Sequence, residues 1–423
     1  MAIAKKMDGW LTSRRLRAHA IILAACLWSV YAWNLATPGL RDRGGNLKGT
    51  DFLHFYTLGS LAIEHCGADL YDMNAQAALA AQRVPQAAGL RYLPLYPPQV
   101  SLFFGPLAHL PYGSALAAWW ILSTAIYGIC CYAVWQACPR LRSYRSTAFL
   151  LAIAYPAFFH LIAWGQTSAI AIACFTALFF LLRARHDFAA GLVLGCLIFK
   201  PQLGLAAAVV FLSMGAWKTI VGAVLSAGAQ LGVGVLYYGV EPLREWIKTL
   251  THVQKVMPWL EPRPYQTHSL RTFWSQVIPW PHLALGLYGL SAVAVLALTV
   301  LIWKHTLSLP LRFSSLLLAT VLVAPHLTVY DLLILAPAFL LIADWLVELK
   351  TAESTRAKLG DNSPSRWLGT LLYLVYALPL LGWLAHWTHI QLSVIAMTVT
   401  VYVLWIAAAK LSRQLGALSH AVE

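Results

Sequence analysis

The sequence predicts an all-α protein that crosses a membrane many times. Of its 423 residues, 60% are hydrophobic and only 11% are charged, and the mean hydropathy is +0.66. Soluble domains carry charge at about a quarter of their positions. Apolar runs of about 17 to 25 residues, long enough to cross a bilayer as helices, recur between short polar joints. The runs do not alternate between apolar and polar residues, so a membrane β-barrel is excluded.

Charge and cysteine content limit the possible partners and cofactors. The formal net charge of +14 comes from Lys and Arg that cluster at the ends of the apolar runs. Basic residues at such places set the topology and bind lipid headgroups, so we expect membrane lipids and no nucleic acid as partners. Only Cys66 lies in a segment that we place outside the membrane, so no disulfide framework is expected. Cys and His spacings predict no metal site, and we expect no cofactor.

The first span and the segment after it form the first predicted unit. The span covers about residues 18 to 37 and ends at Pro38 and Gly39. Basic residues before it place the N-terminus in the cytoplasm. Residues 38–98 then form a first outer loop that is too long for a simple connector.

Two helices are predicted within this first outer loop. Thr50 is expected to cap a helix over residues 52 to 65, whose apolar surface suits the membrane interface or a position under other loops. Asp72 is expected to cap a second helix over residues 73 to 83. The tyrosines and prolines of residues 92 to 98 predict extended backbone before the chain re-enters the membrane.

The remaining spans are placed by the positive-inside rule. Arg140 should lie in the cytoplasm, which requires a single crossing between the first outer loop and this residue. Residues 114 to 137 are long enough for that crossing, so residues 99 to 113 are predicted as an interfacial or re-entrant segment. Later joints alternate between the two sides and give about 12 transmembrane helices with both ends cytoplasmic. A second outer loop, 239–280, begins with an amphipathic helix. We expect residues 1–423 to form a single membrane domain.

A lone carboxylate follows the first span at Asp51, in the stretch GTDFLHFY that begins at Gly49. Close to lipid, such a group is either exposed to water or functional. The alternative is a helix cap or a loop-bridging side chain. The helix N-terminus favours the ionised carboxylate and the surrounding aromatic residues favour the neutral acid, and the sequence leaves both possibilities open.

Three further ionisable residues stand out. Lys200 lies within an apolar run, next to the helix-breaking Pro201, where a lysine is costly unless it is paired or hydrated. The alternative for Lys200 is snorkelling to the headgroups. His326 begins a joint on the same predicted side as Asp51, and a hydrogen-bonded interfacial histidine is the alternative. Asp331 is placed either to pair with His326 or to cap the next span.

Several short motifs recur in an order that is similar to a known family. They are Asp51-Phe52 with Tyr56, Leu70-Tyr71-Asp72, Tyr92 to Pro98, Pro106-Leu107, Gly165-Gln166, Gly191 with Gly195, Lys200-Pro201, and Pro325-His326 with Tyr330-Asp331. In this order and spacing the chain resembles glycosyltransferase family 87 over roughly residues 45 to 340. Members of that family are polyprenol-phosphate-mannose-dependent α-mannosyltransferases of the GT-C superfamily.

The resemblance implies a GT-C type enzyme of the cytoplasmic membrane whose active site faces the periplasm or the outside. It implies transfer of a sugar, mannose, from a polyprenyl-phosphate donor to a glycolipid or polysaccharide acceptor. Asp51 and His326 would be catalytic, with Asp51 the base. The donor phosphate would be bound by Lys200, Arg263 and Arg271. No second acid accompanies Asp51, so a metal-bridged phosphate is not expected.

The sugar or the acceptor hydroxyl would be bound by a further group of polar and aromatic residues. These are His54, Tyr56, Tyr92, Tyr96, Gln166 and Asp331. For most of them the alternative is an aromatic residue of the interfacial belt or a polar helix end.

Two other classes of protein remain open at this stage. A polytopic lipid or solute transporter without catalytic activity would have paired broken helices and a site at mid-membrane depth. An oligosaccharide polymerase or ligase with a diphosphate-linked donor would use arginines and a histidine of a late outer loop. Loss of the sugar from polyprenol-phosphate-mannose would distinguish the three.

Overall fold

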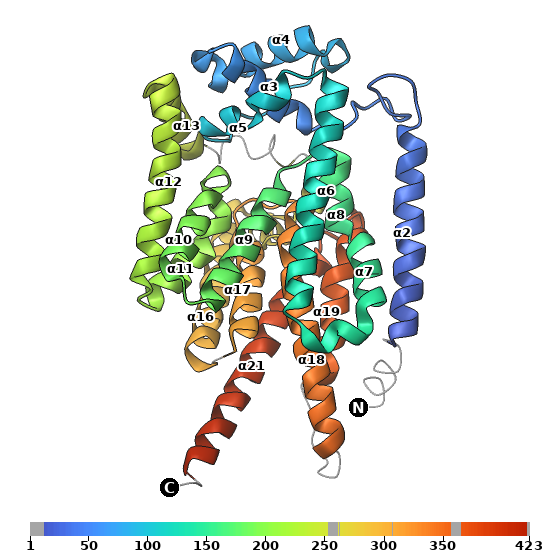
Figure 1. Ribbon diagram of the computed structural model, residues 1–423, viewed down its shortest axis with the longest axis vertical. Coiled ribbons are helices and arrows are strands. Elements are labelled where there is room, and N and C mark those ends of the chain that lie inside the picture. The colour runs from blue at the N-terminus through green and yellow to red at the C-terminus, as the bar shows by residue number, and fades with distance from the viewer. Residues whose placement is uncertain (1–11, 253–260, 262, 307, 357–364, 421–423) are drawn as a thin grey trace.

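The computed structural model describes residues 12–252, 261, 263–306, 308–356 and 365–420. Within these ranges the regular secondary structure is helical, and the only β-pairing is the isolated bridges of Arg41 with Leu47 and of Thr267 with Thr328. The predicted all-α class is confirmed. Figure 1 shows a bundle of long helices beneath a layer of short ones.

Six segments of the described chain are long and apolar enough to cross a membrane. They are α2 (Ser13–Leu35), α6 (Tyr112–Gln136), α12 (Trp217–Tyr238), α16 (Pro281–His305), Val329–Leu349 across η7 (Val329–Leu335) and α18 (Ala336–Arg356), and residues 392 to 409 of α21 (Leu392–His420). A bent pair that includes α7 (Arg145–Ile153) and α8 (Pro156–Trp164) is a possible seventh span.

The predicted count of about twelve spans is not confirmed, because several predicted spans are short or broken helices. The short helices of the bundle are α9 (Ser168–Arg183), α10 (Asp187–Gly195), α11 (Leu205–Ser213), α17 (Leu309–Val323) and α19 (Ser365–Ala377). At Lys200 the backbone leaves the helical region, with φ −136° and ψ 72°, and Pro201 begins the next turn. The predicted helix break at this site is confirmed.

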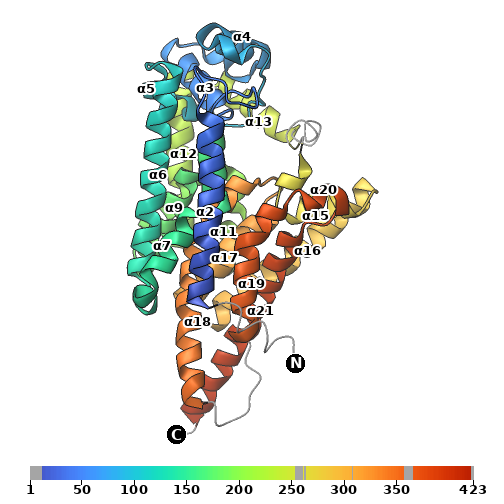
Figure 2. The same cartoon turned by 90° about the vertical axis from the view of Figure 1, so that its right-hand side faces the viewer.

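The bundle has two parts that lie side by side. Figure 2 shows α16, α19 and α21 as one inclined group beside α2, α6, α9 and α12. The short helices α15 (Leu270–Val277) and α20 (Leu384–Thr388) lie at the upper end of the inclined group. The start of α2 and the end of α21 both lie at the lower end of the molecule in Figure 1.

A cap layer covers the upper end of the bundle. It consists of α3 (Phe52–Ile63), α4 (Met73–Arg83), α5 (Gln99–Ala108) and α13 (Glu241–Thr251). The short helix α5 packs against α3 in this layer, below which α6 runs as a full-length helix. The amphipathic helix predicted for the second outer loop is α13, and its Trp246 is buried and donates from its indole nitrogen to the Leu95 carbonyl at 3.0 Å.

The N-terminal ends of α3 and α4 in the cap layer test the two predicted helix caps. Asp72 caps α4 as predicted, because its carboxylate accepts from the backbone of Asn74 and Ala75 at 2.7 and 3.2 Å. The prediction for Thr50 is wrong. Its hydroxyl donates to the Leu47 carbonyl, and Asp51 occupies the N-cap position with no side-chain capping bond. The carboxylate of Asp51 is therefore available for other contacts.

Close glycine packing fixes the helix that leads into the break at Lys200. Helices α10 and α12 cross so closely that a Cβ atom on Gly191 would lie 2.1 Å from the carbonyl oxygen of Thr219. A Cβ atom on Gly222 of α12 would lie 2.4 Å from the carbonyl oxygen of Phe188. Backbones approach in this way in membrane bundles where small residues face each other.

We predict that Gly191→Ala destabilises the protein by about 1–3 kcal/mol, because the methyl group forces the two helices apart. Gly228→Ala on α12 is the control, since nothing lies within 4 Å of a Cβ atom there. Thermal unfolding in detergent measures both variants. Equal melting temperatures for Gly191→Ala and the wild type would show that the crossing is not tightly packed.

Candidate active site

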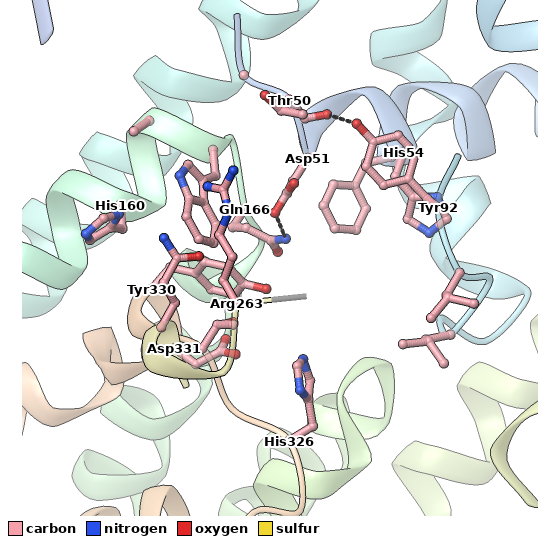
Figure 3. A pocket seen from close by; sticks show the side chains of 18 of the residues that line it. Thr50, Asp51, His54, Tyr92, His160, Gln166, Arg263, His326, Tyr330 and Asp331 are labelled. Atoms are coloured by element: carbon pink, nitrogen blue, oxygen red, sulfur yellow. Dashed lines mark hydrogen bonds between the residues drawn. The ribbon is translucent and has the colours of Figure 1, made fainter. Parts of the chain in front are cut away.

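A cavity of about 1030 Å³ lies between the cap layer and the bundle. Its wall combines residues that are far apart in sequence, from Tyr31 on α2 to Asp331 on η7. Figure 3 shows Asp51 and His54 on one side of this space, with Asp331 and His326 on the opposite side. The fold thus brings both predicted outer loops and the helix break together.

Most of the residues predicted for the site line this cavity. Those on its wall are Asp51, His54, Tyr92, Tyr96, Gln166, Lys200, Arg263, His326 and Asp331. Tyr56 and Arg271 lie behind the wall. The hydroxyl of Tyr56 donates to the Leu110 carbonyl at 2.9 Å, and the guanidinium of Arg271 is bound to Glu261 and to the Pro325 carbonyl.

Asp51 is held at the cavity by the joint between α8 and α9. The amide of Gln166 donates to Asp51 Oδ2 at 2.7 Å, and the backbone N–H of Asp51 donates to the Trp164 carbonyl at 3.0 Å. Gly165 between them has φ +69°, and a Cβ atom there would lie 2.6 Å from Cβ of Phe52. Only glycine allows this close approach of the joint to α3.

Burial decides the protonation question that the sequence left open. It raises the pKa of the Asp51 carboxyl to about 6, while the hydrogen bond from Gln166 and the charge of Lys200 act in the opposite direction. The group is half-buried and faces the cavity. Asp51 is therefore mostly ionised at neutral pH and has a pKa close to that of an effective general base.

Lys200 and Asp331 form a buried ion pair at the cavity wall. Lys200 Nζ lies 2.7 Å from Asp331 Oδ1, and the two side chains are only 5% and 3% exposed. The hydroxyl of Ser168 donates to the same oxygen at 2.5 Å, and Nζ lies 5.0 Å from the centre of the Tyr330 ring. Lys200 does not snorkel. Asp331 pairs with Lys200, so the expectation that it pairs with His326 or caps a span is wrong.

His326 is bound by a residue that the sequence analysis missed. Its Nδ1 lies 2.8 Å from Oε1 of Glu261, and Arg271 contacts the other carboxylate oxygen. The available signal was that Glu261 lies in the same predicted loop as Arg263 and Arg271, but this loop also holds Glu241, Glu245 and Arg244. The sequence did not show which of these groups would meet.

Two further residues predicted for the site, Arg263 and His54, differ in charge. Arg263 is exposed at the cavity and forms no ion pair within the described part of the chain. His54 is buried beside Tyr92 and Tyr96, with ring centres 5.4 and 5.7 Å away, and neither ring nitrogen has a hydrogen-bond partner among the described residues. Burial lowers the pKa of His54 to about 4, so it is neutral at pH 7.

These features define the class of the protein: a polytopic helical membrane protein with a large cavity, carrying ionisable groups on its wall, beneath a cap of short helices. The model of glycosyltransferase family 87 matches residues 95–325, which is more than half of the chain. The chain belongs to glycosyltransferase family 87. It is therefore a membrane glycosyltransferase, and the GT-C assignment fits this family. No curated protein and no solved structure matches the chain.

The matched region contains some of the cavity residues and omits others. It includes Gln166, Lys200 and Arg263, ends one residue before His326, and begins well after Asp51. The place of Asp51 at the site is thus given by the geometry and not by the family match.

We predict that Asp331→Asn destabilises the protein by about 3–5 kcal/mol, because it leaves the buried charge of Lys200 without a counter-charge. The matched control is Lys248→Gln, which breaks an exposed pair with Glu245 and should change the stability by less than about 1 kcal/mol. Thermal unfolding in detergent measures both. An unchanged melting temperature for Asp331→Asn would contradict a dry, charged pair.

Proposed function

We propose that the protein transfers mannose from a polyprenyl monophosphate to a hydroxyl of a glycolipid or polysaccharide acceptor. The observation that carries the proposal is the position of Asp51. Its carboxylate caps no helix, is held by Gln166, and faces a cavity that also holds Arg263 and His326.

The groups on the wall match the needs of transfer from a sugar phosphodiester. The acceptor oxygen attacks the anomeric carbon and forms the new glycosidic bond, while its proton passes to Asp51. The bond between the anomeric carbon and the phosphate oxygen breaks, and its electron pair stays on that oxygen. The products are the glycosylated acceptor, polyprenyl phosphate and protonated Asp51. Attack opposite the leaving phosphate inverts the anomeric centre, so a β-linked donor gives an α-linked product.

The cations of the site divide into two roles. Arg263 has no carboxylate partner among the described residues, so its charge is available to the leaving phosphate together with His326. The charge of Lys200 is balanced by Asp331, and that of Arg271 by Glu261. We propose that Lys200 contributes mainly by favouring the ionised form of Asp51.

The shape of the cavity supports a lipid-linked donor. At about 1030 Å³ it lies at the upper end of the range of small-molecule sites, so it has room for more than one sugar unit. Leu205 on α11 lines the cavity and is 46% exposed, and the exposed Val209 and Leu212 continue from it along the same face of the helix. An apolar chain attached to the phosphate can therefore lie in the membrane while the sugar occupies the cavity.

The distribution of basic residues supports an active site on the outer side. Arg140, Arg142, Arg183 and Lys304 belong to helix ends away from the cap layer, where α2 also begins. By the positive-inside rule that end is cytoplasmic. The cap layer and the cavity then face the periplasm or the outside of the cytoplasmic membrane.

We predict that Asp51→Asn lowers the turnover of polyprenol-phosphate-mannose by at least about 100-fold, because the amide cannot accept the hydroxyl proton. Asp72→Asn is the matched control, since asparagine also caps helices and Asp72 lies outside the cavity. Purified protein with donor and a membrane glycolipid extract provides the assay. Near-normal turnover in Asp51→Asn would remove this residue as the base.

The rate should also depend on pH through Asp51. Because the pKa of its carboxyl is about 6, the ionised form is lost as the pH falls through that value. We expect the initial rate to fall about tenfold per pH unit below about pH 6 and to level off above it. Initial rates between pH 4.5 and 8 test this. A rate that stays constant down to pH 4.5 would contradict a carboxylate base with this pKa.

A further inference from the structure

We propose that Glu261 is a positioning residue that orients the imidazole of His326 toward the donor phosphate. The inference rests on the proposed transfer from a polyprenyl phosphate. It adds a role for a residue of the second predicted outer loop, on the wall of the same cavity.

The contacts of Glu261 engage both of its oxygens. Oε1 lies 2.8 Å from Nδ1 of His326, and Oε2 accepts from the guanidinium of Arg271. The hydroxyl of Thr272 lies 3.5 and 3.4 Å from the two oxygens. A carboxylate this well bound is fixed in orientation, and it fixes the groups that it contacts.

The charge of Glu261 determines which nitrogen of His326 faces it with a proton. Burial alone would raise the pKa of the Glu261 carboxyl, but the hydrogen bond from His326 and the charge of Arg271 lower it below its usual value. An ionised carboxylate only accepts hydrogen bonds, so Nδ1 must be the protonated donor. Nε2 is then the ring nitrogen left for a ligand in the cavity that His326 lines, and it donates to a phosphate oxygen when the ring is an imidazolium with both nitrogens protonated.

The backbone around His326 is held by the same loop. Arg271 donates to the carbonyl of Pro325, and the N–H of His268 donates to the Leu327 carbonyl at 3.0 Å. Thr267 forms an isolated bridge with Thr328. Arg271 and its neighbours thus fix the backbone of the joint, whereas Glu261 fixes the ring.

The pairing also removes an electrostatic conflict. A free carboxylate on the wall would repel the phosphate of the donor. The charge of Glu261 is balanced by Arg271, so the side chain can hold His326 from behind without opposing an anion in the cavity. This arrangement resembles the carboxylate that orients a histidine in many catalytic and metal sites.

Four variants test the inference with polyprenol-phosphate-mannose as substrate. They are Glu261→Gln, Glu261→Asp, His326→Gln and the double variant Glu261→Gln with His326→Gln. Glu261→Gln should lower kcat/KM for the donor by about 10–100-fold, as expected for loss of an orienting partner. Glu261→Asp keeps the charge on a shorter side chain and should lose less. In the His326→Gln background, Glu261→Gln should have no further effect, because its partner is already absent.

The control is Glu241→Gln on α13, whose carboxylate pairs with Arg244 on an exposed surface. Melting temperatures of all variants separate a loss of fold from a loss of orientation. If Glu261→Gln is not recovered as folded protein, Glu261→Asp replaces it, and its effect is compared in the wild type and in the His326→Gln background.

Losses that multiply in the double variant would overturn the inference, and so would a Glu261→Gln rate within twofold of the wild type. Both results require an active wild type. A wild-type protein that leaves the donor intact would instead overturn the proposed function. The two failures are therefore distinguishable.

Discussion

The hydrogen bond between Gln166 and Asp51 connects the cap layer to the helical bundle at the point where chemistry is proposed. It depends on Gly165, whose left-handed backbone lets the joint between α8 and α9 approach the first residue of α3. The carboxylate is engaged from the bundle side, and Asp51 makes no side-chain capping bond to its own helix. The position of a single side chain thus links the fold of a long loop to the packing of two membrane helices.

The charges around the cavity follow one rule, which is that each buried charge has a partner. Lys200 is paired with Asp331, and Glu261 is paired with Arg271 and His326. Asp51 has an amide partner, so burial raises its pKa instead. Among the described residues, Lys48, Arg91 and Arg263 are cations on the wall without a carboxylate partner, and this imbalance favours an anionic ligand. The site therefore combines a moderately weak acid with a positively charged wall, as sugar transfer from a phosphate requires.

Much of this architecture could be predicted from sequence, because hydrophobic run length and helix punctuation are local signals. The cap at Asp72 and the break at Lys200 were found in this way, and the resemblance to the family supplied most of the predicted residues that line the cavity. The span count was not, since short helices that pack inside a bundle lack the length signal of a full span. Pairings between distant residues were also missed: Asp331 meets Lys200, and Glu261 meets His326, across 131 and 65 positions. Only the folded chain brings these groups together.

We propose that Asp51 and the cations of the cavity act on opposite sides of the anomeric carbon, Asp51 on the attacking hydroxyl and the cations on the leaving phosphate. A structure of the protein with a bound polyprenyl-phosphate sugar tests this most directly. The account predicts that the phosphate contacts Arg263 and His326 and that the lipid leaves the cavity past Leu205. It also predicts space for an acceptor hydroxyl within about 3 Å of Asp51, on the side of the anomeric carbon away from the phosphate. A donor whose phosphate lies against Asp51, or whose sugar lies outside the cavity, would contradict the account.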